Sequence, residues 1–201
     1  MQSPSFLYAL APGAERAEPK HAPFVYGTCR RILGRQHIES QFKDKHVWVP
    51  TKDIGVDLLV TNSANTKAVT LQVKFSRDFL PIMKLRPSVL TQLKSCAWFS
   101  VDRHKLTHSG AHYWILVLLG FEERSYDYAI IKTNALLKKL QATYGGSSRN
   151  QVYVWLTKQT QAWLSIGLKK EDQDRIAEGT FVGENRDLTK YLNDWSAIKN
   201  L

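Results

Sequence analysis

The sequence has 201 residues, of which 43% are apolar and 23% charged, and this composition excludes a collagenous, low-complexity or wholly disordered chain. No run approaches the roughly 18 consecutive apolar residues of a membrane helix, so we expect a soluble, cytoplasmic protein. Lys and Arg number 28 against 18 Asp and Glu, a net charge of +10 that favours a polyanionic partner such as nucleic acid. Residues 1–106 hold 16 basic and 8 acidic side chains and residues 107–201 hold 12 and 10, so the positive field belongs to the first half.

The first segments of the chain predict an arm followed by a helix. Residues 1–23 contain four prolines, which no regular element tolerates in its interior, and they predict an irregular N-terminal arm. From residue 24 to about residue 42 the apolar side chains fall near helical spacing, and Gly34 interrupts them. We therefore expect one helix, broken or weakened at this glycine.

Three extended segments come next. Residues 46–50 alternate and end at a proline, and residues 56–60 predict a second strand. Residues 61–66 read Thr-Asn-Ser-Ala-Asn-Thr, which is typical of a turn, and residues 68–75 are extended again. The pattern predicts a hairpin formed by the second and third of these strands.

The middle of the chain predicts one helix and two buried strands. Residues 88–98 place apolar side chains on one helical face, namely Val89, Leu90, Leu93 and Ala97. Residues 113–119 and 128–131 are continuous apolar runs, which suit strands that are buried on both faces. The order of elements is then helix, three strands, helix, strand and strand.

The last third of the chain adds two helices and a strand. Thr133 can cap a helix that ends at Gly145-Gly146, residues 152–156 predict a strand, and residues 187–200 carry apolar side chains at helical spacing. We expect an α/β fold with a central mixed β-sheet flanked by helices. Its core spans residues 24–142, and residues 143–201 form a C-terminal elaboration packed on the same domain.

The most informative stretch is Asp-Ile-Gly-Val-Asp-Leu-Leu-Val over residues 53–60, followed by Gln72-Val73-Lys74. Side chains two apart on a strand point to the same face, so Gln72 and Lys74 project together, and hairpin pairing brings Asp57 beside them. A partly buried carboxylate, amide and ammonium among apolar strand residues need an explanation, because an unpaired buried lysine is unfavourable.

Phosphodiester hydrolysis supplies an explanation, because it needs a divalent ion and a positioned water. Mg²⁺ prefers oxygen ligands and keeps several waters, so the Asp57 carboxylate, the Gln72 side-chain oxygen and the Val73 carbonyl would hold it together with the substrate phosphate. Mn²⁺ is the alternative ion. Lys74 would orient or deprotonate the water or stabilise charge on the phosphate, and the sequence leaves these roles open.

The spacing of Gly55-Val-Asp57 and Gln72-Val-Lys74, on this order of elements, resembles the PD-(D/E)XK nuclease superfamily, which has a restriction-endonuclease-like core. The resemblance covers about residues 24–142 and implies that Asp57 and Gln72 bind the metal and that Lys74 is catalytic. Gln72 stands where the family carries an acid. Many members add a glutamate from the first helix, for which Glu39, 18 residues before Asp57, is the matching position. Asp53 is a turn residue or a further ligand.

Beyond the motif, five basic side chains are candidates for a surface that follows the DNA backbone without reading sequence. They are Lys84, Arg86, Lys94, Arg103 and Lys105. The alternative is an ordinary solvated face. His104, His108 and His112 recur at intervals of four, but Gly110 argues against one continuous helix that would bring them together on a zinc ion.

The resemblance implies a Mg²⁺-dependent DNA endonuclease acting on double-stranded DNA. The alternative is a catalytically degenerate, non-enzymatic DNA-binding subunit with the same fold, and RNA is a third possibility. One chain holds one candidate site, so breaking a duplex requires a second copy or a partner subunit, and we expect a homodimer. Residues 163–168 hold apolar side chains that would serve as either interface or core.

Overall fold

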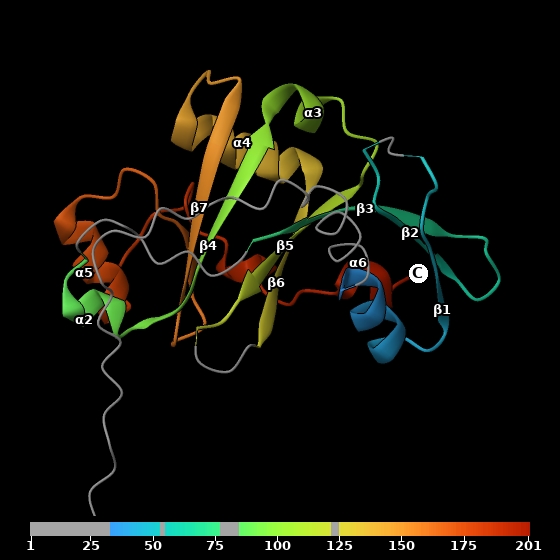
Figure 1. The fold of residues 1–201 in the computed structure, drawn as a ribbon, viewed down its shortest axis with the longest axis horizontal. Coiled ribbons are helices and arrows are strands. Elements are labelled where there is room, and N and C mark those ends of the chain that lie inside the picture. The colour runs from blue at the N-terminus through green and yellow to red at the C-terminus, as the bar shows by residue number, and fades with distance from the viewer. Residues whose placement is uncertain (1–32, 53–54, 77–84, 122–124) are drawn as a thin grey trace, which may run out of the picture.

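The computed structural model describes residues 33–52, 55–76, 85–121 and 125–201, and the predicted arm over residues 1–23 lies outside this part of the chain. The described residues form a mixed α/β fold with one five-stranded sheet, one three-stranded sheet and surrounding helices (Figure 1). The first helix covers residues 33–41 of the range predicted to be helical. No helix in the described ranges is long and apolar enough to cross a membrane.

The five-stranded sheet has the strand order β1-β2-β3-β5-β6, in which only β3 and β5 run parallel. Its members are β1 (Lys45–Trp48), β2 (Leu58–Asn62), β3 (Ala68–Phe75), β5 (Tyr113–Leu119) and β6 (Tyr126–Lys132). The antiparallel pairing of β2 with β3 confirms the predicted hairpin. Its turn is held by the Asn62 side-chain oxygen, which accepts from the backbone N–H of Thr66 at 2.9 Å and of Lys67 at 3.1 Å.

The three-stranded sheet contains β4 (Leu93–Asp102), β7 (Arg149–Thr157) and β8 (Ala162–Leu164), all antiparallel. The helix predicted over residues 88–98 is wrong, because only α2 (Pro87–Leu90) is helical and the rest begins β4. The reason is that burial alternates with a period of two residues from Ala97 onwards. Ala97, Phe99 and Val101 are buried, while Trp98 and Ser100 are exposed. Pairing with β7 along the whole strand favours this pattern over the helical one.

Two helices flank the sheets near the middle of the chain. The sequence did not predict α3 (Arg103–Thr107), whose first turn is capped by Asp102 accepting from the Lys105 N–H at 3.0 Å. The predicted helix after residue 133 is confirmed as α4 (Thr133–Tyr144), but Thr133 does not cap it. The Thr133 hydroxyl instead donates to the Ala111 carbonyl, and Lys132 takes the N-cap position.

The C-terminal segment has little regular helix. Residues 143–201 supply β7, β8, α5 (Lys170–Glu178), the short η1 (Thr189–Tyr191) and α6 (Ser196–Lys199). The single helix predicted over residues 187–200 is therefore wrong. Asn193 interrupts it with a φ of 51°, because its backbone N–H donates to the Tyr128 carbonyl and its side-chain oxygen accepts from the Tyr128 N–H at 2.9 Å.

The two faces of the five-stranded sheet pack against different partners. One face, which we call the helix face, carries Leu58, Leu71 and Ile115 and buries them against Ile38 of the first helix and Ile198 of α6. The opposite face packs its β5 and β6 residues against α4 and the three-stranded sheet. Figure 1 shows β4 and β7 over one end of the five-stranded sheet, while β1 and β2 extend away at the other end. Among the described residues, the three-stranded sheet and α4 therefore cover this second face at β5 and β6.

Candidate active site

Asp57 lies where the chain enters β2, immediately after a turn at Gly55. Gly55 has a φ of +79°, a conformation that favours glycine, and it redirects the chain into the strand. The Asp57 backbone N–H donates to the Leu71 carbonyl at 2.8 Å and continues the β2–β3 ladder by one residue. This pairing places the Asp57 side chain opposite Gln72, on the face of the sheet opposite the helix face, and leaves the residue only 8% exposed.

The Asp57 carboxylate is held by β3. Its Oδ2 atom accepts from the Val73 backbone N–H at 2.9 Å and from the Gln72 side-chain amide. The Val73 N–H points towards β2 just beyond the last residue pair of the two strands, so the carboxylate takes the place of a missing strand partner. Two donors thus fix the orientation of a nearly buried carboxylate.

Lys74 lies two residues after Gln72 and therefore on the same face. Its side chain is half-buried, and its Nζ atom lies 5.4 Å from the centre of the Trp114 ring, a cation–π distance. Trp114 is itself fixed by its Nε1 atom, which donates to the Ser109 hydroxyl at 3.3 Å. The predicted cluster of Asp57, Gln72 and Lys74 therefore meets on one face, as the hairpin register required.

The oxygen atoms at this place suit a hard divalent ion. The Val73 carbonyl points to the same edge of β3 as its N–H, because both groups of one strand residue face the same neighbour. The donor set is then one carboxylate, one amide oxygen and one backbone carbonyl, which fits Mg²⁺ if water and substrate complete the shell. The described ranges hold no group of three His, Cys, Asp or Glu side chains that suits a metal ion, so the charge of this site rests on Asp57.

The structure does not bring Glu39 to the cluster. Glu39 accepts from the Arg35 guanidinium at 2.8 Å on the exposed side of the first helix. Gly34 and Ile38 of the same helix pack against Leu58 and Val73, which lie on the helix face of the sheet. Lys74 lies on the opposite face, so this helix does not reach the cluster. Asp53, the other candidate ligand, lies outside the described residues.

The predicted DNA-contacting residues do not share one surface. Arg86 forms an ion pair with Asp174 of α5, and Lys94 forms one with Asp127 at 2.9 Å. Arg103 and Lys105 lie on α3, which begins directly after β4, whereas Arg86 precedes β4 at its other end (Figure 1). Lys84 is not among the described residues.

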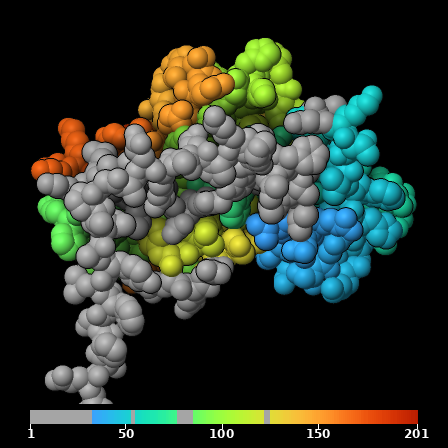
Figure 2. All heavy atoms as spheres, viewed as in Figure 1, coloured from blue at the N-terminus to red at the C-terminus, as the bar shows by residue number. Residues whose placement is uncertain are grey.

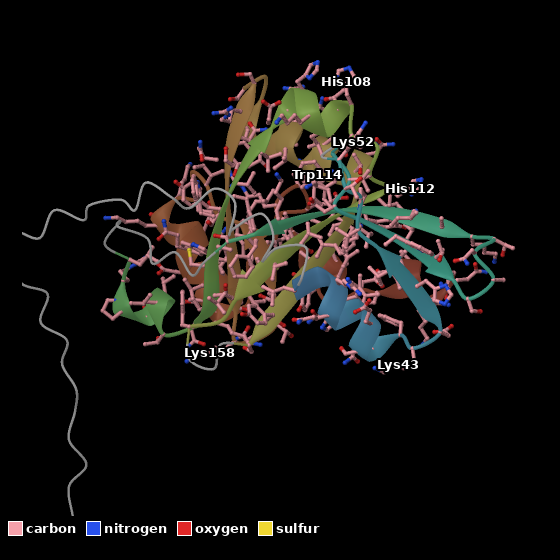
Figure 3. All side chains as sticks on the ribbon, turned by 45° about the vertical axis from the view of Figure 1, so that its right-hand side comes forward. Lys43, Lys52, His108, His112, Trp114 and Lys158 are labelled. Carbon is pink, nitrogen blue, oxygen red and sulfur yellow. The ribbon has the colours of Figure 1, made fainter. Side chains whose placement is uncertain are left out.

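A rim made of one lysine and two imidazoles next to the cluster was not predicted. Thr70 of β3 donates from its hydroxyl to the Gly110 carbonyl at 2.8 Å, and its backbone N–H donates to Nδ1 of His112 at 3.0 Å. These contacts place the loop after α3 beside the site. Figure 3 shows Lys52, His108 and His112 projecting on one side of the molecule. The signal in the sequence is that residues 103–121 contain no carboxylate side chain. The histidine spacing was weighed only for a zinc site, against which Gly110 argues.

The apolar run at residues 163–168 belongs largely to the core. In β8, Trp163 is 5% exposed and Leu164 is fully buried. Leu168 packs against the apolar core residues around Trp163. Of the two alternatives, the structure therefore favours the core for Trp163, Leu164 and Leu168.

Comparisons of the chain with protein-family models, with curated proteins and with solved structures find no match.

Proposed function

We propose that this protein is a Mg²⁺-dependent DNA endonuclease with a restriction-endonuclease-like core, similar to the PD-(D/E)XK nucleases. The observation that supports it most is the Asp57 carboxylate, which is bound across two strands to Gln72 and Val73 on the face that carries Lys74. The antiparallel β2–β3 hairpin and the parallel β3–β5 pair provide a mixed sheet of the expected kind.

Asp57, Gln72 and Lys74 would have different roles in hydrolysis. Asp57, Gln72 and the Val73 carbonyl would hold Mg²⁺, and the ion when bound supplies positive charge that polarises the phosphate. Lys74 has three N–H donors and lies on the same face, so it is suited to hold the attacking water or to bind a phosphate oxygen. In the reaction the water oxygen bonds to phosphorus, and the bond from phosphorus to one sugar oxygen breaks.

A second candidate function is a catalytically degenerate DNA-binding subunit. It is favoured by two observations: Gln72 donates its amide to Asp57, and Glu39 pairs with Arg35. Among the described residues, Asp57 is then the one carboxylate at the cluster. The retention of both Asp57 and Lys74 on one face favours the enzyme. RNA is a further substrate class for the same chemistry.

The experiment that separates these functions is plasmid nicking by the purified full chain in Mg²⁺, in Mn²⁺ and in EDTA. We expect relaxed circles in either metal and intact supercoils in EDTA. A labelled RNA strand run in parallel tests the third possibility. Tight DNA binding without cleavage in any metal would leave the binding subunit as the function.

The number of active sites in the assembly decides whether one or both strands of a duplex are cut. One chain offers one cluster, and we propose a homodimer on DNA because two-fold assemblies are the commonest and match palindromic sites. Light scattering with and without DNA measures this directly. A monomer under all conditions, combined with nicking of one strand, would remove the homodimer.

A further inference from the structure

A surface next to the cluster is left uncovered by the three-stranded sheet. It lies on the face that carries Asp57 and Lys74 and is made by β1, β2 and the start of β3. The strand register brings together Trp48, Leu59 and Thr70 in one row across it, because Trp48 pairs with Leu59 and Leu59 with Thr70. We call this row and its neighbour Thr61 the platform. Figure 2 shows that residues 33–75, blue to cyan-green, form one end of the molecule.

Trp48 is the aromatic side chain of the platform. It is 53% exposed, although it belongs to a strand in which Lys45 is buried and Val47 packs against the core. Its Nε1 atom donates to the Thr61 hydroxyl at 3.3 Å, and that hydroxyl donates in turn to the Asn65 side-chain oxygen at 2.6 Å. The indole is therefore anchored at its edge while more than half of its surface remains open.

The position of Trp48 links it to the cluster. Trp48 lies opposite Leu59, and Asp57 precedes Leu59 by two residues on the same face. Diagonal neighbours of this kind lie roughly 7–8 Å apart. A base attached to, or next to, a phosphate at Asp57 and Lys74 would therefore lie over Trp48.

The charge around the platform suits a polyanion. Across residues 44–75, the described part carries four lysines against the carboxylates of Asp44 and Asp57. Lys45 is buried and paired with Asp44 at 2.8 Å, so Lys52, Lys67 and Lys74 are the lysines that add positive charge here. The loop after α3, which contacts Thr70, adds His108 and His112 and no acid. The aliphatic Leu59 and the Thr61 hydroxyl lie beside Trp48, a combination that suits a ligand with a flat aromatic part and polar groups at its edge.

We propose that Trp48 stacks on an unpaired base of the substrate, so that the enzyme acts on nucleic acid with a single-stranded segment beside the cut. A paired base inside a duplex shows only its edge, whereas an indole on a flat sheet surface needs a free base face. The inference rests on the proposed function only in assuming that cleavage occurs at Asp57 and Lys74. The stacking contact itself is a binding property and is measurable without cleavage.

The test is fluorescence polarisation of the full chain in EDTA with three labelled probes of equal length. They are a single DNA strand, a blunt duplex and the RNA counterpart of the single strand. Wild-type protein should bind a single strand more tightly than the duplex, and the tighter of the two strands identifies the sugar. Trp48→Ala should weaken single-strand binding roughly tenfold or more and duplex binding much less. Trp48→Phe should recover most of the loss, since a benzene ring still stacks.

Tyr126→Ala is the matched control. Tyr126 is also exposed, at 39%, but it lies on the opposite edge strand and near Phe75 on the helix face. It should bind like wild type. Cross-linking of wild-type protein to an iodouracil-containing strand gives a second readout that needs no variant, and the adduct should map to the peptide containing Trp48. Equal losses for strand and duplex in Trp48→Ala, or an adduct elsewhere, would overturn the proposal.

The same data separate this inference from the nuclease itself. If the wild-type protein cuts DNA in Mg²⁺ but Trp48→Ala binds single strands normally, only the stacking proposal is lost. If no metal supports cleavage but the Trp48 effect is found, the platform remains a binding surface and the nuclease proposal is lost.

Discussion

The two faces of the five-stranded sheet differ in what covers them. On the helix face, Leu58, Leu71, Val73 and Ile115 are all fully buried beneath the first helix and α6. On the opposite face, the described apolar cover packs against β5 and β6, and the polar cluster lies beside it on β2 and β3. Apolar cover stabilises the sheet, whereas the Asp57 and Lys74 side chains lie on the opposite face, nearly buried and half-buried respectively.

The largest expected effect compares adjacent residues of β2 on opposite faces. Leu58→Ala should lower the free energy of unfolding by about 2–5 kcal/mol, because the fully buried side chain leaves a cavity beneath the first helix. Leu59→Ala, on the half-exposed platform, should cost less than about 1.5 kcal/mol. Urea unfolding followed by circular dichroism measures both. Equal costs would mean that the two faces are covered alike.

The next effect concerns Gln72, which stands where the PD-(D/E)XK nucleases carry a second acidic residue. Gln72→Glu places a carboxylate against Asp57, so in EDTA we expect Tm to fall by about 2–4 °C through like-charge repulsion. Excess Mg²⁺ should reverse the loss, because two carboxylates hold the ion better than one. Differential scanning fluorimetry measures the shift.

Gln151→Glu, on an exposed position of β7, is the matched control for this change. Its Tm should respond to Mg²⁺ no more than that of wild type. If Gln72→Glu shows the same small response, the cluster does not bind the ion.

The smallest expected effect is on the salt dependence of DNA binding. Lys52→Glu, at the exposed rim beside the cluster, should reduce the slope of log affinity against log salt by about 1 for each lost phosphate contact. Lys170→Glu, at the start of α5, should leave the slope unchanged. Filter binding over a series of salt concentrations gives both slopes, and identical slopes would show that the rim beside the cluster does not select the binding face.

The sequence was informative where local pattern and tertiary packing agree. Alternation and turn chemistry predicted the β2–β3 hairpin, and the same period-two rule placed Gln72 and Lys74 together. It failed at residues 93–98, where a short helical pattern competes with a longer strand pattern that only pairing with β7 reveals. It failed again near Asn193, whose hydrogen bonds to Tyr128 come from a strand 65 residues away in sequence.

In the candidate site, too, local sequence pattern predicted some features, while others depend on tertiary contacts. The strand register brings Asp57 to Gln72, and sequence spacing alone was sufficient to predict it. Whether Glu39 reaches the cluster depends on which face of the sheet the first helix covers, which spacing does not encode. The rim at His108 and His112 depends on the loop that Thr70 holds, and no local pattern indicates that contact.

The most direct test of the cluster is the single-turnover cleavage rate of Asp57→Asn in Mg²⁺, with DNA affinity measured in EDTA. Asparagine keeps the size of the side chain but removes its charge, so we expect the rate to fall at least about a hundredfold while affinity stays within a few-fold of wild type. Asp102→Asn is the control, because asparagine also caps α3, and its rate should match wild type. A wild-type rate in Asp57→Asn would contradict the assignment of this cluster as the catalytic site.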